Sequence, residues 1–470
     1  MMKPFLPLFL WYYPWALTFR WTQAYSSQEL LHEMGIGWNL GNTLEAFGDW
    51  ITGTTPQAYE TAWGNPVTTE AMIQAVRGYG FRTVRIPVAW SNLMEKDGTY
   101  TINALLLKRV EEVVGYALKH QLFVILNIHY DGGWWTQFAD DTTKEEAFRK
   151  YKRIWEQVAE YYREYDEHLI FESLNEEGCF DTLWNRYSMT GDKGKAYGLL
   201  NQINQTFVEI VRESGGRNTE RHLLLAGYCT DIDLTVDWTY TVPQDSQQRV
   251  MVSVHYYTPS SFTLLEEDAD WGKAETYWGS TTEINYLKSE FNKLKSRFVD
   301  QGIPVIIGEF GVTASNKDPE SHYLFLRTVT EYALELGICP IVWDHGQYFN
   351  RKALTFKDPT IGKLFQEIDQ SLNLPPFTII TTTTATATTA TTTTTNTKNK
   401  TTIATATTTT TTAIIKSSPT PTTTTTTTIP NNNSLPTSIA SMAPIVQRIM
   451  DLYLPMVSPE LQIFNISTTL

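Results

Sequence analysis

Short apolar, β-branched segments alternate with longer amphipathic segments along most of this chain, and this alternation constrains the fold more than any other feature. Apolar runs separated by helical patterns are typical of the parallel strands of an α/β protein. Eight repeats of strand and helix over about 340 residues predict a (β/α)8 barrel, the TIM barrel. The predicted strands are Gly35–Leu40, Thr83–Pro87, Phe123–Ile128, Leu169–Ser173, Leu223–Ala226, Met251–His255, Val305–Gly308 and Ile338–Val342.

The segments between these strands carry helix signals. Thr68-Thr69-Glu70 is a pattern that begins a helix, and Gly302 or Gly337 is placed to end one. An open, doubly wound sheet is the alternative, but no glycine-rich dinucleotide-binding turn follows the first predicted strand. The predicted helices are Thr69–Gly78, Asn103–His120, Lys144–Tyr165, Tyr197–Ser214, Glu283–Val299 and Glu320–Leu336.

Polar and aromatic residues follow six of the eight predicted strands. The functional residues of a TIM barrel lie at these carboxyl ends, so the residues should gather at one rim of the barrel. They occur in Arg85-Ile86-Pro87, Asn127-Ile128-His129-Tyr130-Asp131, Leu174-Asn175-Glu176-Glu177, His255-Tyr256-Tyr257, Gly308-Glu309-Phe310-Gly311 and Trp343-Asp344.

Two glutamates of this rim form a candidate catalytic pair. Glu176 follows the fourth predicted strand and Glu309 follows the seventh. A single glutamate in such a place is most often a salt-bridge partner. Two of them at an aromatic-lined rim favour glycoside hydrolysis, which needs an acid to protonate the leaving oxygen and a carboxylate to attack or to activate water.

Four motifs occur in the order in which a known family has them. They are Gly37-Trp38-Asn39-Leu40-Gly41-Asn42-Thr43-Leu44-Glu45, Val84-Arg85-Ile86-Pro87-Val88, Leu174-Asn175-Glu176 and Ile307-Gly308-Glu309-Phe310-Gly311. The ordered set resembles glycoside hydrolase family 5, the large cellulase family, over roughly Leu30 to Leu374. The resemblance implies a retaining double displacement, for which the two carboxyl groups must lie about 5–5.5 Å apart.

The resemblance also implies a role for each residue of the pair. Glu176 would be the acid/base and Glu309 the nucleophile. Arg85 would keep Glu309 ionised, because a nearby cation lowers the pKa of a carboxylate. Tyr257 would donate a hydrogen bond to the same carboxylate.

The other implied roles concern the sugar. Asn175 would hold its 2-hydroxyl, and His129 would bind further hydroxyls. His255 would orient the acid/base, and Trp343 would stack beneath the sugar at the cleavage point. We also expect three neighbouring aromatic residues in the cleft: Tyr130, Trp134 and Trp135.

The sequence departs from the family pattern beside the cleavage point. Tyr130 stands where many relatives have a histidine, and Glu177 stands where proline is frequent. The leading interpretation is a secreted endo-β-1,4-glucanase acting on cellulose or related β-glucans. A xyloglucanase, a β-mannanase or a mixed-linkage glucanase would use the same chemistry, and a non-catalytic carbohydrate-binding barrel is the alternative from another class. A phosphate-handling barrel would need a glycine-rich loop after strands seven and eight.

The charge and the aromatic content of the chain limit the kinds of molecule that it can bind. The net charge is −14, and the segment after residue 380 carries +2, which leaves −16 on residues 1–380. An acidic body repels phosphate backbones, so we expect no nucleic acid partner. The 15 Trp and 24 Tyr suit stacking on sugar rings. We expect a monomer with a β-glucan substrate, and the chemistry requires no cofactor or metal.

The two terminal segments differ in composition from the rest of the chain. Residues 1–24 have a basic start, a mostly apolar run and small residues at Thr22-Gln23-Ala24, as in an export signal. That run is shorter than the roughly 20 residues of a membrane-spanning helix. We therefore expect a catalytic domain over residues 25–377. Residues 378–430 would form a linker or stalk, because threonine makes up 30 of the 50 residues from 381 to 430. Residues 431–470 have no predicted role.

Three cysteines show no metal-binding spacing. Cys179 lies three residues after Glu176, and Cys229 follows the fifth predicted strand. Neighbouring strands are about 4.8 Å apart, so both cysteines open onto one rim within reach of a disulfide. Cys339 begins the eighth strand at the opposite face. We expect a Cys179–Cys229 bridge and a buried free thiol at Cys339; the alternative is three free thiols.

Overall fold

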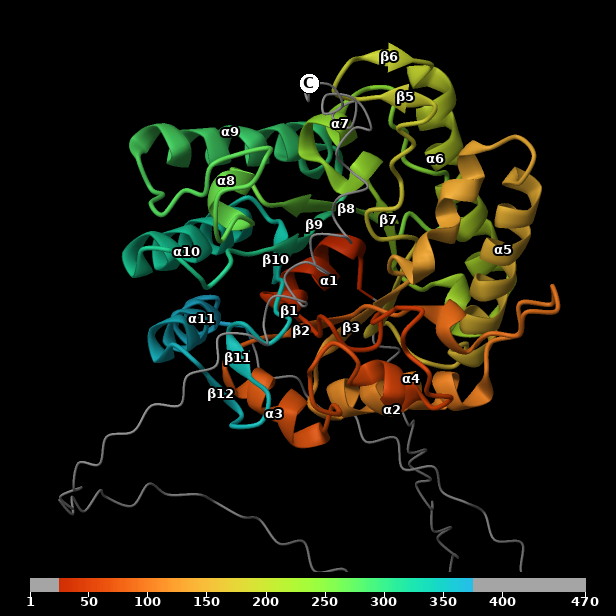
Figure 1. Cartoon of the computed structure of the whole chain (residues 1–470), viewed down its shortest axis with the longest axis horizontal. Helices are drawn as coiled ribbons and strands as arrows, with labels where there is room; N and C mark the ends of the chain where they lie inside the picture. The colour runs from red at the N-terminus through yellow and green to blue at the C-terminus, as the bar shows by residue number, and fades with distance from the viewer. Residues whose placement is uncertain (1–24, 375–470) are drawn as a thin grey trace, which may run out of the picture. The chain divides into compact units, whose positions relative to one another are not determined.

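Eight parallel strands pair side by side and close into a barrel (Figure 1). The computed structural model describes residues 25–374. The order around the barrel is β1-β10-β9-β8-β7-β4-β3-β2, and β1 pairs with both β2 and β10. The predicted TIM barrel is therefore confirmed. Its strands are β1 (Gly37–Asn39), β2 (Thr83–Ile86), β3 (Phe123–Asn127), β4 (Leu169–Glu172), β7 (Leu223–Ala226), β8 (Val250–Tyr256), β9 (Val305–Phe310) and β10 (Cys339–Val342).

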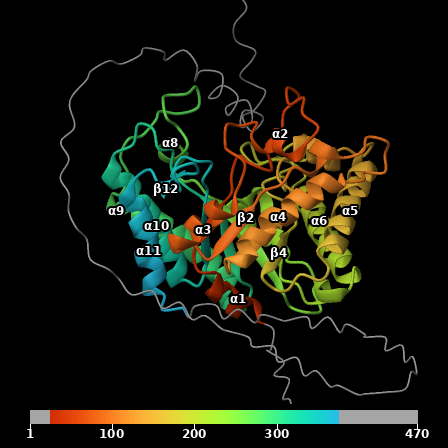
Figure 2. The same ribbon diagram turned by 90° about the horizontal axis from the view of Figure 1, so that it is seen from below.

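Helices surround the strands, as the two views at right angles show (Figures 1 and 2). Side-chain caps begin several of them: Thr69 accepts from the backbone N–H of Met72, and Asp318 accepts from that of Ser321. The α-helices are α1 (Ser27–Met34), α2 (Pro56–Glu60), α3 (Glu70–Gly78), α4 (Ala104–Lys119), α5 (Lys144–Tyr161), α6 (Lys193–Glu213), α7 (Ile232–Val236), α8 (Ser260–Thr263), α9 (Thr281–Arg297), α10 (Pro319–Glu335) and α11 (Pro359–Ser371).

Short elements complete the described chain. The 3-10 helices are η1 (Trp90–Leu93), η2 (Asp131–Ala139), η3 (Gly216–Thr219), η4 (Tyr228–Thr230) and η5 (Val299–Gln301). Two small hairpins lie outside the barrel: β5 (Trp184–Asn185) with β6 (Thr190–Gly191), and β11 (Phe349–Asn350) with β12 (Thr355–Phe356).

Alternation along each strand divides the side chains between two layers. In β8, Val252 and Val254 pack into the large apolar core between strands and helices. Met251 belongs to a second apolar cluster that includes residues of five other strands. Farther along the same inward face, Ser253 and His255 replace apolar residues with polar ones. The barrel interior is therefore apolar toward its amino end and polar toward its carboxyl end.

Helix α1 closes the apolar end of the barrel. Its Leu30, Leu31 and Met34 pack on the inner cluster, together with Cys339. A capping box begins the helix, since Ser26 and Glu29 exchange side-chain and backbone hydrogen bonds. Figure 2 shows α1 at the lower end of the barrel. This helix was not predicted from the sequence, whereas Cys339 was correctly predicted to be a buried free thiol.

All eight strands and six helices lie where the sequence predicts them, with shifts of a few residues at their ends. The largest differences are in α6, which begins at Lys193, and in α5, which ends at Tyr161. The predicted export signal and the threonine-rich and terminal segments lie outside the described residues. Among residues 25–374, no helix is both long and apolar enough to cross a bilayer.

Candidate active site

Arg85 is the centre of the polar end of the barrel. It points inward from β2, is completely buried, and donates four hydrogen bonds from its guanidinium. Nε donates to Glu172 at 2.7 Å, and Nη1 donates to Glu309 at 2.7 Å and to Asn39 at 3.1 Å. Nη2 donates to Asn175 at 2.8 Å. These contacts fix the position of one cation beneath several rim residues at once.

Glu172 balances the charge of Arg85. It is fully buried at the end of β4 and also accepts from Asn127 Nδ2 at 3.0 Å and Ser253 Oγ at 2.9 Å. Complete pairing is what permits two buried charges at this depth. Glu172 was not predicted as a site residue, although a charged residue within an apolar strand is a signal for a buried polar contact.

A bulge in β9 turns Glu309 into the barrel. Ile306 points inward and Ile307 outward, so strict alternation would turn Glu309 outward. The pairing with β8 skips Gly308: Val254 lies opposite Ile307, and His255 lies opposite Glu309. Asn39 Nδ2 donates to the carbonyl oxygen of Gly308 at 2.9 Å.

Gly308 also makes room for its neighbour on β8. A Cβ at this position would lie 2.9 Å from Ser253 Oγ and 3.1 Å from His255 Nε2. Only a residue without a side chain therefore allows the bulge and the inward His255 to coexist.

Glu309 and Glu176 have different surroundings. Arg85 donates to Glu309 Oε1, and Tyr257 Oη donates to its Oε2 at 3.1 Å. Glu176 follows β4 and contacts His255 Nδ1 at 2.7 Å. The side chain of Glu176 is 26% exposed, whereas that of Glu309 is 6% exposed. One carboxylate thus lies open to a ligand, and the other is held from below.

The two carboxylates are close together. One oxygen of each lies within 4.8 Å of the other, and of a ring nitrogen of His255. Three such donors could also hold a cation, but Arg85 already supplies the positive charge at Glu309. The short separation matches retaining glycosidases, since inverting ones need about 6.5–9.5 Å to admit a water.

Electrostatics differ at the two carboxylates. Burial raises the pKa of Glu309, and the charges of His255 and Arg85 oppose that effect. Burial also acts on Glu176, but its hydrogen bond to His255 and the charge of that ring lower its pKa overall. Glu176 Oε1 and His255 Nδ1 lie 2.7 Å apart, so a direct hydrogen bond joins the two side chains.

His129 and Trp343 form one wall of the site. Their rings stack with centroids 5.7 Å apart and planes 5° apart. Burial lowers the pKa of His129 well below its usual value, and Arg85 and His255 add to this, so the ring is neutral. Gly41 allows the approach of Trp343, because a Cβ there would lie 2.9 Å from the indole ring.

The three additional aromatic residues lie in the loop after β3 but do not behave alike. Tyr130 and Trp135 are half-buried. Trp134 is buried, donates from its indole nitrogen to Asp131 at 2.7 Å, and has Lys150 Nζ 4.6 Å from its ring centre. Trp134 therefore packs the loop against α5, away from the wall made by His129 and Trp343.

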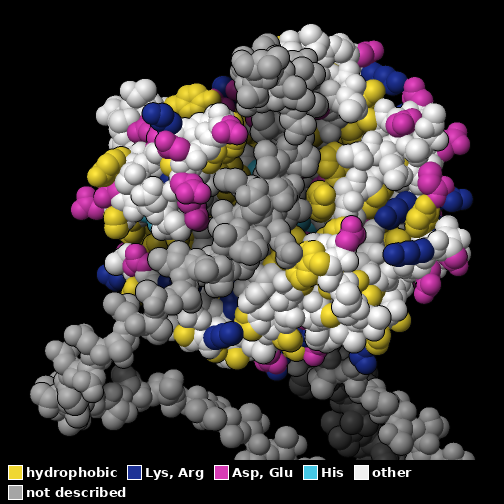
Figure 3. All heavy atoms as spheres, in the orientation of Figure 1, with side chains coloured by type: hydrophobic (Ala, Val, Ile, Leu, Met, Phe, Trp, Pro, Cys, Tyr) yellow, Lys and Arg dark blue, Asp and Glu magenta, His cyan; other side chains and the backbone are white. Residues whose placement is uncertain are grey.

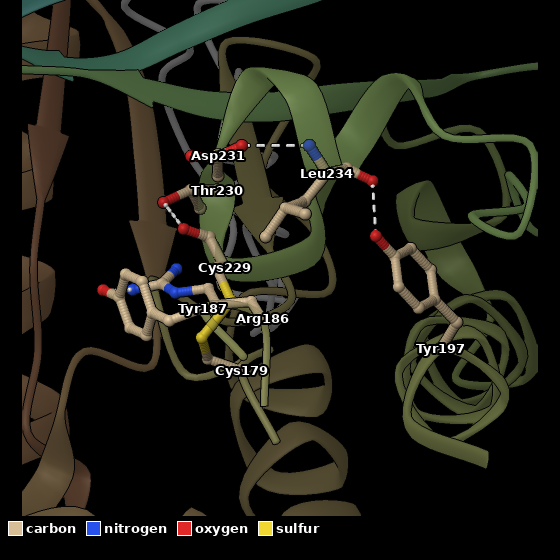
Figure 4. Close-up of a disulfide and its surroundings, with 8 residues drawn as sticks. All are labelled: Cys179, Arg186, Tyr187, Tyr197, Cys229, Thr230, Asp231 and Leu234. Atoms are coloured by element: carbon tan, nitrogen blue, oxygen red, sulfur yellow. Dashed lines mark hydrogen bonds between the residues drawn. A yellow bond between two sulfur atoms is a disulfide. The ribbon is translucent and has the colours of Figure 1, made fainter. Parts of the chain in front are cut away.

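The predicted bridge between Cys179 and Cys229 is present (Figure 4). Their Cα atoms lie 4.6 Å apart, and the backbone N–H of Cys229 donates to the carbonyl of Gly178 at 3.2 Å. Figure 4 shows Arg186 and Tyr187 beside the bridge. The disulfide therefore ties the loop that carries Glu176 to the turn after β7.

Replacing both bridged cysteines with serine should lower the free energy of unfolding by about 4 kcal/mol, because the bridge closes a loop with a sequence separation of 50. Thermal unfolding with and without reductant checks this. Reductant should lower the Tm of the unaltered protein and leave that of the double variant unchanged, since Cys339 is present in both. A Tm insensitive to reductant in both proteins would contradict the prediction.

Comparisons with known proteins agree on one family. A family model described as Cellulase (glycosyl hydrolase family 5) matches residues 44–349. Endoglucanase A of Paenibacillus barcinonensis is 38% identical over 352 residues, covering 69% of this chain and 84% of that protein. A xyloglucan-specific endo-β-1,4-glucanase of Bacteroides ovatus is 34% identical over 341 residues, covering 68% of this chain and 65% of that protein. The structure of a lichenase from Caldicellulosiruptor sp. F32 matches with a TM-score of 0.68 at 32% identity, covering 74% of this chain and 96% of that one.

Proposed function

The chain belongs to glycosyl hydrolase family 5 and is a glycoside hydrolase of β-1,4 linkages, and we propose that it is a secreted, retaining endo-β-1,4-glucanase with Glu309 as nucleophile and Glu176 as acid/base. The observation that carries this assignment is the pairing of each carboxylate. Glu309 is nearly buried and is held by hydrogen bonds from Arg85 and Tyr257, whereas Glu176 is more exposed and is hydrogen-bonded to His255.

The proposed reaction has two steps. Glu309 attacks the anomeric carbon while Glu176 gives its proton to the departing oxygen, and a covalent glycosyl-enzyme forms. Glu176, now a carboxylate, then takes a proton from a water that attacks the same carbon, and Glu309 is released. Two inversions leave the configuration unchanged. His255, 2.7 Å from Glu176, holds the acid/base in place and exchanges the proton with it.

Asn175, His129 and Trp343 would bind the sugar. Arg85 Nη2 donates to Asn175 Oδ1, which leaves Nδ2 as the group available to the 2-hydroxyl. A neutral His129 can exchange hydrogen bonds with further hydroxyls. Trp343 presents a half-buried indole for stacking. These features support recognition of a glucose unit, whose 2-hydroxyl is equatorial.

We propose a β-1,4-linked glucan as substrate, including mixed-linkage and substituted glucans. The names of the relatives support this breadth, since they include an endoglucanase, a xyloglucan-specific glucanase and a lichenase. The disulfide supports export, because such bridges persist mainly in oxidising compartments. Recovery of the enzyme only from the cell interior would argue against export.

Release of reducing sugars from four polymers tests the proposal. Carboxymethylcellulose, lichenan and xyloglucan should be cleaved, and β-mannan should be cleaved roughly 10-fold more slowly or worse, because its axial 2-hydroxyl misses Asn175. Proton NMR of the first products should show the β-anomer before mutarotation. Initial formation of the α-anomer would exclude retention, and no release from any polymer would favour a non-catalytic binding barrel.

A further inference from the structure

Glu177, the residue after the proposed acid/base, joins two loops of the rim. Its side chain is buried, with 2% of the residue exposed. Oε1 accepts from the backbone N–H of Tyr130 at 2.5 Å, and Oε2 accepts from the backbone N–H of Asn175 at 2.6 Å. Tyr130 lies in the loop after β3, and Asn175 lies in the loop after β4. One carboxylate therefore spans the gap between the two loops.

The loop that Glu177 holds has an unusual backbone. Tyr130, Asp131, Gly132 and Gly133 all have positive φ, at 37°, 52°, 80° and 73°. Glycine adopts this region freely, but Tyr130 and Asp131 do so at a cost that neighbouring contacts must offset. Two carboxylates provide such contacts: Asp131 accepts from the backbone N–H of Ser91 at 2.6 Å, and Glu177 accepts from that of Tyr130.

The position of Tyr130 matters to the cleft. It directly follows His129, whose ring stacks on Trp343, and its own ring meets Phe47 edge-on with centroids 6.4 Å apart. On the other loop, Asn175 directly precedes Glu176 and accepts from Arg85. Glu177 thus connects the wall of the cleft to the backbone that carries the acid/base.

The carboxyl group of Glu177 is not explained by a contribution to the stability of the fold. Among the residues that the structure describes, no Lys, Arg or His side chain forms an ion pair with the Glu177 carboxyl group, in contrast to Glu172 and Glu309, which pair with Arg85. Burial raises the pKa of Glu177 to about 8, even though the N–H donors that it accepts from lower it. Burying a carboxyl group without a cation costs folding energy, which points to a function for its geometry.

We propose that Glu177 is a positioning residue of the active site, which fixes Glu176 relative to the loop of Tyr130 by accepting from one backbone N–H of each loop. The inference rests on the proposed role of Glu176 as acid/base. An amide in place of the carboxylate would keep the shape but turn an NH2 donor toward one of the two N–H donors. One loop would then be released.

The test compares substrates with different leaving groups. A misplaced acid slows departure of a poor leaving group, whereas a good leaving group needs little protonation. In Glu177→Gln, kcat on an unactivated cello-oligosaccharide should fall roughly 10- to 100-fold, and kcat on a dinitrophenyl cellobioside should fall less than about 3-fold. Glu177→Asp keeps the carboxyl group but shortens its reach, so its kcat on the unactivated substrate should lie between that of Glu177→Gln and that of the unaltered enzyme. This variant replaces Glu177→Gln if the amide variant does not fold.

A control variant distinguishes an effect on the position of Glu176 from a general effect on protein stability. Asp245 is also a carboxylate that accepts from a backbone N–H, that of Arg249 at 2.9 Å, but it lies just before β8 at the opposite end of the barrel. Asp245→Asn should leave both kcat values unchanged. The inference is wrong if Glu177→Gln lowers kcat equally on the two substrates, or on neither, and Glu176→Ala still loses more activity on the poor leaving group than on the good one. Equal losses in Glu176→Ala would overturn the proposed role of Glu176, and this inference with it.

Discussion

Glu309→Ala should reduce turnover of every glucan by roughly 10⁴-fold or more, because no covalent intermediate can form without the carboxylate. Arg85 would remain paired with Glu172 at 2.7 Å, so the polar network beneath the site would persist. The cavity left by the carboxylate would accept a small anion beside the guanidinium. Added azide should therefore restore part of the activity on a substrate with a good leaving group.

The configuration of the azide product identifies the residue that was lost. In Glu309→Ala, azide attacks in a single displacement from the side of the missing carboxylate, so the product should be the α-glycosyl azide. Glu290→Ala, which removes a buried carboxylate of α9 paired with Lys293, is a control for folding and should retain activity. A β-glycosyl azide from Glu309→Ala would show that the roles of the two glutamates are exchanged.

Glu176→Ala should show losses that depend on the leaving group. On cellulose and cello-oligosaccharides, kcat should fall by about 10² to 10⁴-fold, the range that general acid catalysis supplies. On a dinitrophenyl glycoside the first step needs no proton, so the glycosyl-enzyme should form and accumulate. Azide should then release it as the β-glycosyl azide, because Glu309 is intact and two inversions occur.

The pH dependence of the same variant provides a second measurement. In the unaltered enzyme the alkaline limb of kcat/KM should report loss of the acid proton of Glu176, which is hydrogen-bonded to His255 at 2.7 Å. Since kcat/KM rises with protonation of this pair, activity should fall as pH rises through its apparent pKa. Glu176→Ala should lose that limb on the dinitrophenyl substrate. A limb that persists unchanged would assign the proton to another group.

The strands were predictable because most of them are short apolar runs that are buried on both faces. The bulge at Gly308 was not predictable, because strict alternation along β9 would turn the side chain of Glu309 outward. Glu309 was placed at the site by the ordered family motifs. Helix α1 had a signal that was not used, the Ser26 and Glu29 capping box. The hairpin of β5 and β6 has two residues in each strand, too few to show any period.

Among the site residues, too, some contacts were predictable from the sequence and others were not. The structure brings together, as the sequence indicates, six residues that lie near or just beyond the carboxyl end of a barrel strand: Arg85, Asn175, Glu176, His255, Tyr257 and Glu309. The contacts of Glu177 with Tyr130 and Asn175 depend on backbone N–H groups of two loops. Such contacts depend on loop conformation, which carries no periodic signal in the sequence.

The first and last strands of the barrel meet beside Glu309, the proposed nucleophile. β1 pairs with β10 through Gly37 and Trp38, and Asn39 at the end of β1 reaches the bulge of β9. A chain without the final repeat would therefore lack both this seam and Trp343, the residue that follows β10.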